Sequence, residues 1–506
     1  MASRTNPWTG RALALLATLA ALWAVMRVHA AGEALLAVTL LVVTGFALWT
    51  YSSGRTHALR YLFPGVAAAV VFVIFPMLYT LGIGFTNYSS SNLLDKAAAT
   101  RYLQDQAVQK PGSARPFGLV REGDVLRVWL PADEGRSALL SEPIKTAAEP
   151  QAVALIDATA APGAAVALKD TVALLPTLRQ LSLRTPRGEV LAVNSLREVA
   201  VMQPLYRAAG DDALTDQLTG TTYRADDNTG FYASEAGDRL TPGYRIGVGL
   251  AHYRQIFTEG KFREPFGSVF IWTVAFAALS VAGAAGLGLV LAVLMNWDAL
   301  PFKGAYRLVL FLPYAVPGFI SILVFKGLFN QNLGEVNLIL GNLFGIKPAW
   351  FSDPWLAKLM LVFVNVWLGF PYMMVLCTGL IKAIPADLYE ASAVAGANAW
   401  VNFRAITLPL ILKPLTPLLI SAFAFNFNNF VLISLLTGGR PDQLDSNLPA
   451  GTTDILVSYT WRIAFQDSGQ QFGLASAIST VIFLIVAAIT LIQMRYTRIA
   501  SDEPRK

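Results

Sequence analysis

The sequence predicts a polytopic α-helical membrane protein with eight transmembrane helices and a large β-rich insertion outside the membrane. The chain has 506 residues, of which 55% are hydrophobic and 14% charged, whereas soluble domains carry about 25% charged residues. Several apolar runs are long enough to cross a hydrocarbon core of about 30 Å, which excludes a large soluble enzyme. One stretch rich in charged residues, 87–265, separates the third run from the fourth.

Eight apolar runs are predicted to span the membrane. They are Ala12–Met26, Leu35–Tyr51, Tyr61–Thr86, Ser268–Asn296, Tyr306–Leu328, Leu356–Leu380, Leu415–Leu436 and Phe472–Met494. The first run could instead be a signal peptide, but a second span follows it almost at once and favours a retained helix. Lys and Arg gather in the loops that are cytoplasmic if the N-terminus is inside, so both termini are expected in the cytoplasm.

The predicted spans and the insertion divide the chain into four parts. Residues 1–60 form two N-terminal transmembrane helices, 61–86 a third, 87–265 an extracytoplasmic domain, and 266–506 the remaining five spans. The insertion holds 21 acidic and 20 basic residues, so the net charge of +6 comes from membrane-flanking positions and argues against a nucleic-acid partner. Its expected strands include Val125–Leu130, Ala152–Ile156, Val172–Leu175 and Glu189–Val193.

The sequence gives no sign of an enzyme, a metal site or a bound cofactor. Cys377 is a single cysteine inside an apolar run, and the three histidines lie far apart. The pair Gly260-Lys261 has Gln255 where a phosphate-binding loop needs glycine. No Asp or Glu lies inside the eight apolar cores, which argues against an ion-coupled carrier because such carriers keep ionisable groups there.

Polar and aromatic residues share one face of the sixth and of the seventh predicted spans. They are Asn365, Gly369 and Tyr372 in the sixth span, and Ala422, Phe425, Asn426 and Asn429 in the seventh. The asparagines could simply join helices through hydrogen bonds. They could also bind a neutral sugar, because uncharged amides pair with its hydroxyls and aromatic rings cover its C–H surfaces.

The loop between these spans, residues 385–409, is predicted to be a short helix begun by Pro385 or Asp387 and ended at Gly396, then a second turn ended at Pro409. An ordinary connection between two spans would also explain an alanine-rich loop. Its spacing is more specific: a Glu-Ala-Ser triplet, a glycine six residues after the glutamate, and an Ile-x-Leu-Pro motif. The residues concerned are Glu390, Ala391, Ser392, Gly396, Ile406 and Pro409.

This spacing resembles the EAA loop of permeases from binding-protein-dependent ABC importers. The resemblance implies that the loop docks into a separate ATPase subunit, with Glu390 as the charged anchor and Gly396 as the turn. ATP and Mg would then be bound by two such ATPase subunits, and this chain would need no cofactor of its own.

The motifs Trp-Leu-Gly-Phe-Pro-Tyr-Met-Met from Trp367 and Ala-Phe-Asn-Phe-Asn-Asn-Phe-Val-Leu from Ala424 narrow the resemblance to the larger permease subunit of maltose/maltodextrin importers. Ala422 stands where the family pattern can place a serine. The sugar-binding residues implied by the resemblance are Asn365, Leu368, Gly369, Tyr372, Phe425, Asn426 and Asn429.

The same resemblance implies a six-helix importer core preceded by two extra helices, in the bacterial inner membrane. It implies an immunoglobulin-like periplasmic insertion that contacts a soluble maltose-binding protein. It also implies that the chain assembles with a second permease subunit and two ATPase subunits. Maltose or maltodextrin would pass from the binding protein across the membrane. Two alternatives stay open at this point: a permease for another neutral oligosaccharide, and an ion-coupled sugar carrier.

Overall fold

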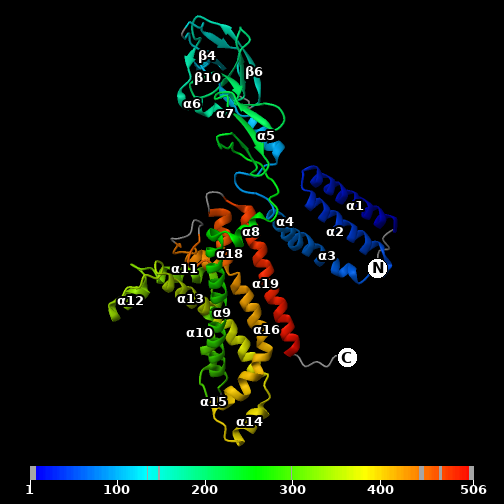
Figure 1. Ribbon diagram of the computed structural model, residues 1–506, viewed down its shortest axis with the longest axis vertical. Helices are drawn as coiled ribbons and strands as arrows, with labels where there is room; N and C mark the ends of the chain where they lie inside the picture. Colours follow the sequence, from blue (N-terminus) through cyan, green and yellow to red (C-terminus); the bar gives the residue numbers. More distant parts are fainter. Residues whose placement is uncertain are drawn as a thin grey trace. The chain divides into compact units, whose positions relative to one another are not determined.

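The computed structural model describes residues 7–133, 135–145, 149–297, 299–443, 450–466 and 470–500. The chain divides into two compact units, one formed by Met1–Ser90 with Gly247–Lys506 and the other by Ser91–Ile246 (Figure 1). The first unit holds the long apolar helices and the second holds the strands. The β-rich insertion therefore interrupts a helical membrane protein, as predicted.

Within the described residues, seven helices are long and apolar enough to cross a membrane, or eight if one bent pair counts as a span. The predicted polytopic helical fold is confirmed. The helices of this unit include α1 (Pro7–Ala30), α2 (Ala34–Ser52), α3 (Leu59–Ala69) continued through a π-helical turn into α4 (Phe75–Ile83), α8 (Ala251–Thr258), α9 (Gly260–Asn296), α10 (Lys303–Ala315), α11 (Gly318–Leu328), α13 (Pro354–Lys382), α16 (Leu408–Phe427), α17 (Phe430–Leu436), α18 (Leu456–Trp461) and α19 (Phe472–Ala500).

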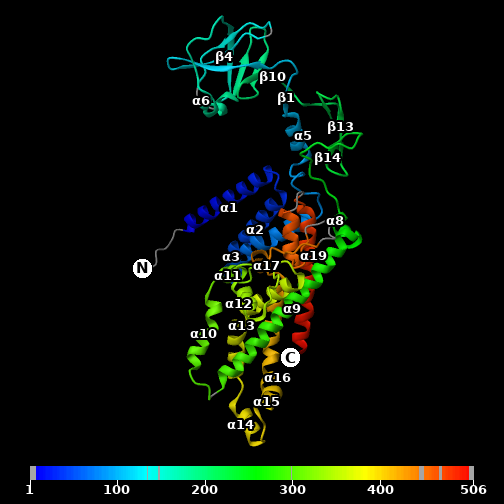
Figure 2. The same ribbon diagram turned by 90° about the vertical axis from the view of Figure 1, so that its left-hand side faces the viewer.

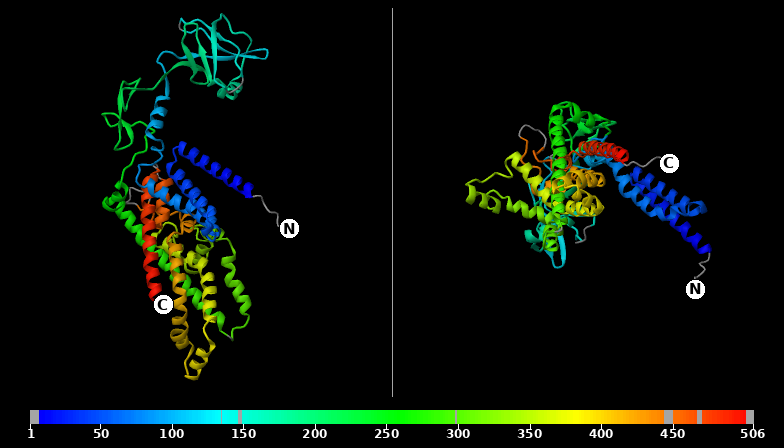
Figure 3. Two further views of the ribbon diagram at one scale, coloured as in Figure 1. Left: turned by 90° about the vertical axis from the view of Figure 1, so that its right-hand side faces the viewer. Right: turned by 90° about the horizontal axis from the view of Figure 1, so that it is seen from below.

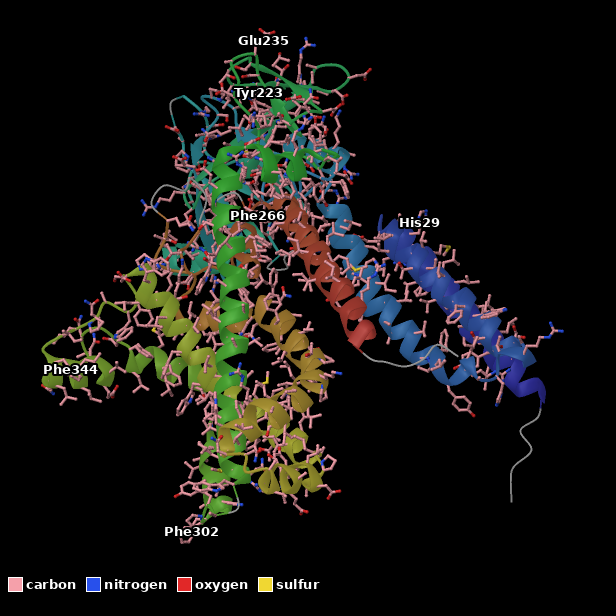
Figure 4. All side chains as sticks on the ribbon, turned by 60° about the horizontal axis from the view of Figure 1, so that its bottom comes forward. His29, Tyr223, Glu235, Phe266, Phe302 and Phe344 are labelled. Atoms are coloured by element: carbon pink, nitrogen blue, oxygen red, sulfur yellow. The ribbon has the colours of Figure 1, made fainter. Side chains whose placement is uncertain are left out.

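The fifth predicted span, Tyr306–Leu328, is broken into α10 and α11, which are bent by 90° relative to each other. Pro317 lies at the break and is the N-cap residue of α11, while Pro313 lies inside α10. Proline has no N–H to donate and disfavours helical geometry in the residue before it, so the helix ends at Ala315. Another short apolar helix, α12 (Glu335–Phe344), then connects to α13, with Phe344 at its end (Figure 4).

The seventh predicted span, Leu415–Leu436, was wrong at both ends. Its helix begins earlier, because α15 (Ala399–Asn402) runs through a π-helical turn, Phe403–Thr407, directly into α16. Pro409 therefore does not end a turn, since it is the second residue of α16, directly after the π-helical turn. At the other end α16 stops at Phe427, and Asn429 begins α17 with its side chain accepting a hydrogen bond from the Leu432 N–H.

The core of the helical unit is the packing of α9 against α13 and α16 (Figures 1 and 2). Asp353 fixes the start of α13, because its carboxylate accepts hydrogen bonds from the backbone N–H groups of Trp355 and Leu356 at 2.9 and 2.8 Å. A buried cluster around Phe276, Leu361 and Val364 joins α9 to α13. These contacts hold the residues of the candidate site on neighbouring helices.

The insertion contains two sheets. One has ten strands in the order β1-β10-β9-β8-β6-β5-β4-β3-β7, with β2 paired to β10, and the other has four in the order β11-β12-β13-β14. Pairing is antiparallel except between β6 and β8. The strands are β1 (Ala107–Gln109), β2 (Arg115–Pro116), β3 (Gly118–Glu122), β4 (Val125–Leu130), β5 (Leu139–Ser141), β6 (Gln151–Asp157), β7 (Ala164–Ala165), β8 (Leu181–Arg184), β9 (Val190–Val193), β10 (Glu198–Pro204), β11 (Tyr206–Ala208), β12 (Ala213–Asp216), β13 (Thr222–Asp226) and β14 (Phe231–Ala233). An immunoglobulin-like form stays a prediction.

Three of the four strands predicted in the insertion are present as β4, β6 and β9. The fourth, Val172–Leu175, was wrong, because Val172 lies in helix α6 (Leu168–Ala173) and Leu175 begins α7 (Leu175–Leu178). A short apolar run does not by itself distinguish a strand from a helix. Here Pro176 sits in the first turn of α7, a position that proline favours.

The loop that follows α17 is fastened to α18 by a buried ionic cluster. Arg462 donates hydrogen bonds to Asp454 at 2.8 Å and to Asp442 at 2.5 Å. The Asp454 carboxylate is fully buried and also accepts hydrogen bonds from the Gly451 N–H and the Ser458 hydroxyl, both at 2.7 Å. Removing one member of a buried ion pair leaves the other charge uncompensated.

Arg462→Met is therefore expected to destabilise the permease by about 3–5 kcal/mol. Thermal unfolding of the purified protein in detergent measures this as a lower melting temperature. Arg440→Met is the control, because Arg440 is exposed and lies on the same loop. Equal melting temperatures for the two variants would contradict the role given to the buried ion pair.

Candidate functional site

Helix α13 carries the first half of the candidate site. Asn365, Leu368, Gly369 and Tyr372 follow one another along one face of this helix, as their spacing predicts. Asn365 is buried, at 8% exposure, whereas Tyr372 is exposed at 43%. On this face of α13 the amide of Asn365 is therefore covered, while the ring of Tyr372 is accessible.

Helix α16 and the start of α17 carry the second half. Asn426 lies in the last turn of α16, and its Nδ2 donates to the Ala422 carbonyl at 2.8 Å. The helix break after Phe427 places Asn429 at the beginning of α17. Phe425 exposes 71% of its surface, so its ring is free to contact a ligand.

The three predicted asparagines meet in one hydrogen-bonded network. Asn365 Nδ2 donates to Asn426 Oδ1 at 2.6 Å, and Asn429 Nδ2 donates to Asn365 Oδ1 at 3.2 Å. Asn365 therefore joins α13 to both α16 and α17. Such amide bonds between membrane helices contribute about 0.6–2 kcal/mol each.

All seven predicted sugar-site residues line one cavity of about 740 Å³. Its wall also includes residues from α9, α10 and α11, which the sequence interpretation missed. These are Ser280, Val281, Ala284, Pro313, Tyr314, Pro317, Gly318, Phe319 and Ile322. Tyr314 stacks on Tyr372 with ring centroids 6.5 Å apart and an angle of 18° between the planes. The sequence does hold one signal for the cavity residues of α10 and α11. Pro313 and Pro317 lie inside one apolar run, and a helix that is broken within the membrane often lines a cavity.

No charged side chain lines this cavity in the described part of the chain. The polar groups are amides and hydroxyls, and most of the remaining wall is aliphatic or aromatic. This chemistry suits a neutral ligand with many hydroxyl groups and apolar C–H faces. It does not suit a phosphorylated or acidic ligand, whose charge would need a cationic partner.

Close contacts between α9 and α13 define the wall beside Gly369. A Cβ placed at Gly288 would lie 2.7 Å from the Met374 backbone nitrogen, and one at Gly369 would lie 3.2 Å from the Ala284 Cβ. Glycine at these positions lets the two helices approach closely.

The predicted ATPase-contact residues lie in a separate region, between the end of α13 and the start of α16 (Figures 1 and 3). Helix α14 (Ala386–Val394) carries Glu390, Ala391 and Ser392, of which Glu390 and Ala391 are exposed. Gly396 has a left-handed backbone, with φ +74°, and ends this helix. Ile406 lies in the π-helical turn and Pro409 at the start of α16.

Two further contacts brace this loop. The Ser392 hydroxyl donates to Asn402 Oδ1, and the Tyr389 and Thr407 hydroxyls are hydrogen-bonded at 2.9 Å. Large apolar side chains nevertheless remain exposed, with Val394 at 92% and Trp400 at 66%. The loop therefore has a fixed shape and an uncovered apolar surface.

Comparisons with known proteins agree with this organisation. Residues 284–499 match the family described as binding-protein-dependent transport system inner membrane component, and residues 94–249 match the maltose transport system permease protein MalF P2 domain. The maltose/maltodextrin transport system permease protein MalF of Klebsiella aerogenes is 47% identical over 486 residues, which is 94% of each chain. The chain belongs to the maltose/maltodextrin permease family.

The protein of the same name from Escherichia coli K12 is 46% identical over 486 residues, again 94% of each chain. Among solved structures, a bacterial ABC transporter involved in the import of the acidic polysaccharide alginate aligns with a TM-score of 0.44 and 20% identity, over 50% of this chain and 85% of that chain. The predicted resemblance to ABC importer permeases is confirmed by the family matches, and the protein is a multi-pass permease subunit.

Gly288→Ala is expected to lower the stability of the permease by about 1–3 kcal/mol, because the added methyl group meets backbone atoms of α13. Gly286→Ala is the matched control, since a Cβ at Gly286 meets nothing within 4 Å and alanine favours the helix. Thermal unfolding in detergent distinguishes the two variants. Destabilisation of equal size in both would show that the helix contact at Gly288 is not tight.

Proposed function

We propose that this permease carries maltose and maltodextrins across the membrane through the 740 Å³ cavity between α9, α13 and α16. The observation that carries the proposal is an uncharged wall in which three asparagines adjoin the rings of Tyr372 and Phe425. The relatives that match over 94% of the chain are named as maltose/maltodextrin permeases. Asn365, Leu368, Gly369, Tyr372, Phe425, Asn426 and Asn429 are the proposed contact residues.

The amide network explains how a neutral sugar can enter without a large cost. In the structure the asparagines satisfy one another, so a bound sugar hydroxyl replaces an amide–amide hydrogen bond with an amide–hydroxyl bond. Such an exchange is close to neutral in free energy. Stacking of the sugar's C–H faces on the exposed rings of Phe425 and Tyr372 supplies the favourable contribution.

The lack of charge in the cavity also bears on the alternatives. A permease for another neutral oligosaccharide would use the same chemistry. Transport assays with different sugars distinguish such a permease from one for maltose. An ion-coupled carrier would need ionisable groups within its spans. Transport that depends on ATP hydrolysis, and not on an ion gradient, distinguishes this protein from such a carrier.

We also propose that the chain has no catalytic step of its own and that two separate ATPase subunits bind ATP and Mg. Their docking surface is the loop of α14 and α15, with Glu390, Ala391, Ser392, Gly396, Ile406 and Pro409. The exposed side chains of Val394 and Trp400 support this, because exposed apolar side chains of this size are typical of a surface that another protein covers. The remaining partners are a second permease subunit and a periplasmic maltose-binding protein that contacts the insertion. The location is the bacterial inner membrane, with both termini in the cytoplasm.

Asn426→Ala is expected to reduce maltose uptake about tenfold or more, because it removes a sugar contact and leaves Asn365 without its acceptor. Tyr372→Ala is expected to act in the same direction through loss of the ring face. Uptake of radiolabelled maltose by reconstituted vesicles measures both. Asn342→Ala, on an exposed position of α12 outside the cavity, is the control. Normal uptake by both cavity variants, with the complex assembled, would remove this cavity from the transport path.

Substitutions at Gly396 test the docking loop. Gly396→Val is expected to reduce the amount of ATPase that co-purifies, because a β-branched residue in the left-handed region costs about 1–2 kcal/mol and shifts the turn. Gly396→Asn is the matched control at the same position, since asparagine adopts this backbone conformation readily. The measurements are ATPase yield and maltose-stimulated ATP hydrolysis. Equal values for the valine and asparagine variants would show that the turn does not shape the docking surface.

A further inference from the structure

Ser280 lies on α9, on the face of this helix that packs against α13. Close contacts pair position 283 with 366, 284 with 369, and 288 with 373, so a residue of α9 faces one that is 83 to 85 positions later in α13. This register places Ser280 opposite the turn of α13 that ends at Asn365. Ser280 is one turn before Ala284 and on the same side of the helix. It is therefore at the level of the amide network.

The hydroxyl of Ser280 is buried without a partner. The residue is 2% exposed, and its Oγ makes no hydrogen bond. A serine inside a helix can bond to the carbonyl four residues earlier, as Ser421 does to Pro417 at 3.0 Å in the wall of the same cavity. Ser280 does not do so. An unpaired buried hydroxyl is unfavourable, and such a group calls for an explanation.

The asparagines of the cavity, by contrast, are already occupied. Asn365, Asn426 and Asn429 bond to one another, and Asn426 also donates to the Ala422 carbonyl. Among the buried side-chain polar atoms that line the cavity in the described residues, Ser280 Oγ is the one without a hydrogen bond. It is thus a polar group in the wall that a ligand can use without breaking an existing bond.

We infer that Ser280 is a further sugar-contact residue, contributed by α9, whose hydroxyl pairs with a sugar hydroxyl in the loaded cavity. Oγ is covered in the sugar-free protein, so the proposal requires a rotation about χ1 that turns the hydroxyl into the cavity. The bound sugar would then be held from α9 as well as from α13, α16 and the start of α17. This inference rests on the proposed function, because it assigns a residue to the same maltose site.

Ser280→Ala tests the assignment in the reconstituted complex with its ATPase subunits and binding protein. The expected result is a rise of about 3- to 10-fold in the KM for maltose, with kcat changed less than twofold, since one neutral hydrogen bond to the ligand is lost. The melting temperature of the sugar-free protein should be unchanged or higher, because the variant removes an unpaired hydroxyl. Ser268→Ala, at an exposed position of the same helix outside the cavity, is the control.

Monodeoxy analogues of maltose identify the contact. The wild-type protein should discriminate against the analogue that lacks the paired hydroxyl, and Ser280→Ala should lose that discrimination. An unchanged KM for maltose, or unchanged discrimination, overturns the assignment. If Ser280→Ala does not assemble, Ser280→Cys keeps the volume with a weaker donor and should raise the KM in the same direction. Failure of the proposed function is separate, because it would appear as absent maltose uptake by the wild-type complex.

Discussion

The side chain of Asn365 joins the two walls of the transport cavity. Its amide donates to Asn426 and accepts from Asn429, so one residue of α13 determines how α16 and α17 lie beside it. An amide without a partner would be costly in the apolar interior of a membrane protein. The break between α16 and α17 depends on the same network, since Asn429 also caps α17. The shape of the cavity follows from this set of bonds.

The same two helices carry both the cavity and the loop that we propose as the ATPase docking surface. Helix α13 ends at Lys382 and α16 begins at Leu408, and the intervening loop connects them directly. Displacement of the loop must therefore move the ends of the helices that bear Asn365 and Asn426. The Tyr389–Thr407 hydrogen bond and the tight turn at Gly396 brace this loop. The glycine contacts pack a third helix, α9, against α13.

Helical periodicity was enough to predict which residues meet in the cavity. Asn365, Gly369 and Tyr372 repeat at one helical face, and so do Asn426 and Asn429, because a polar side chain in an apolar span must face a partner. The ends and bends of the membrane spans were harder to predict. The sequence did not reveal that the run Tyr306–Leu328 bends at Pro317 and brings Tyr314 to the cavity. A hydropathy pattern indicates which residues are apolar, but it does not give the direction of the helix axis.

The strand predicted at Val172–Leu175 failed for a related reason: four apolar residues fit either a strand or a helix, and tertiary packing decides between them. The contacts between α9 and the other helices also could not be predicted from the sequence. Ser280 is an ordinary serine in an apolar helix until the register with α13 places it opposite Asn365. Pairing between distant helices is a property of the folded chain.

The three asparagines are paired with one another when no ligand is bound, and this affects how easily a bound sugar can leave the cavity. In the proposed function, each hydrogen bond that a sugar gains from the three asparagines replaces one that they made to each other, so these amides add little to its net affinity. Departure then requires no separate force to pull the sugar away, because the asparagines re-pair behind it. Discrimination between sugars would then come from groups of the cavity that do not pair with one another, which are the exposed rings of Tyr372 and Phe425 and the hydroxyl of Ser280.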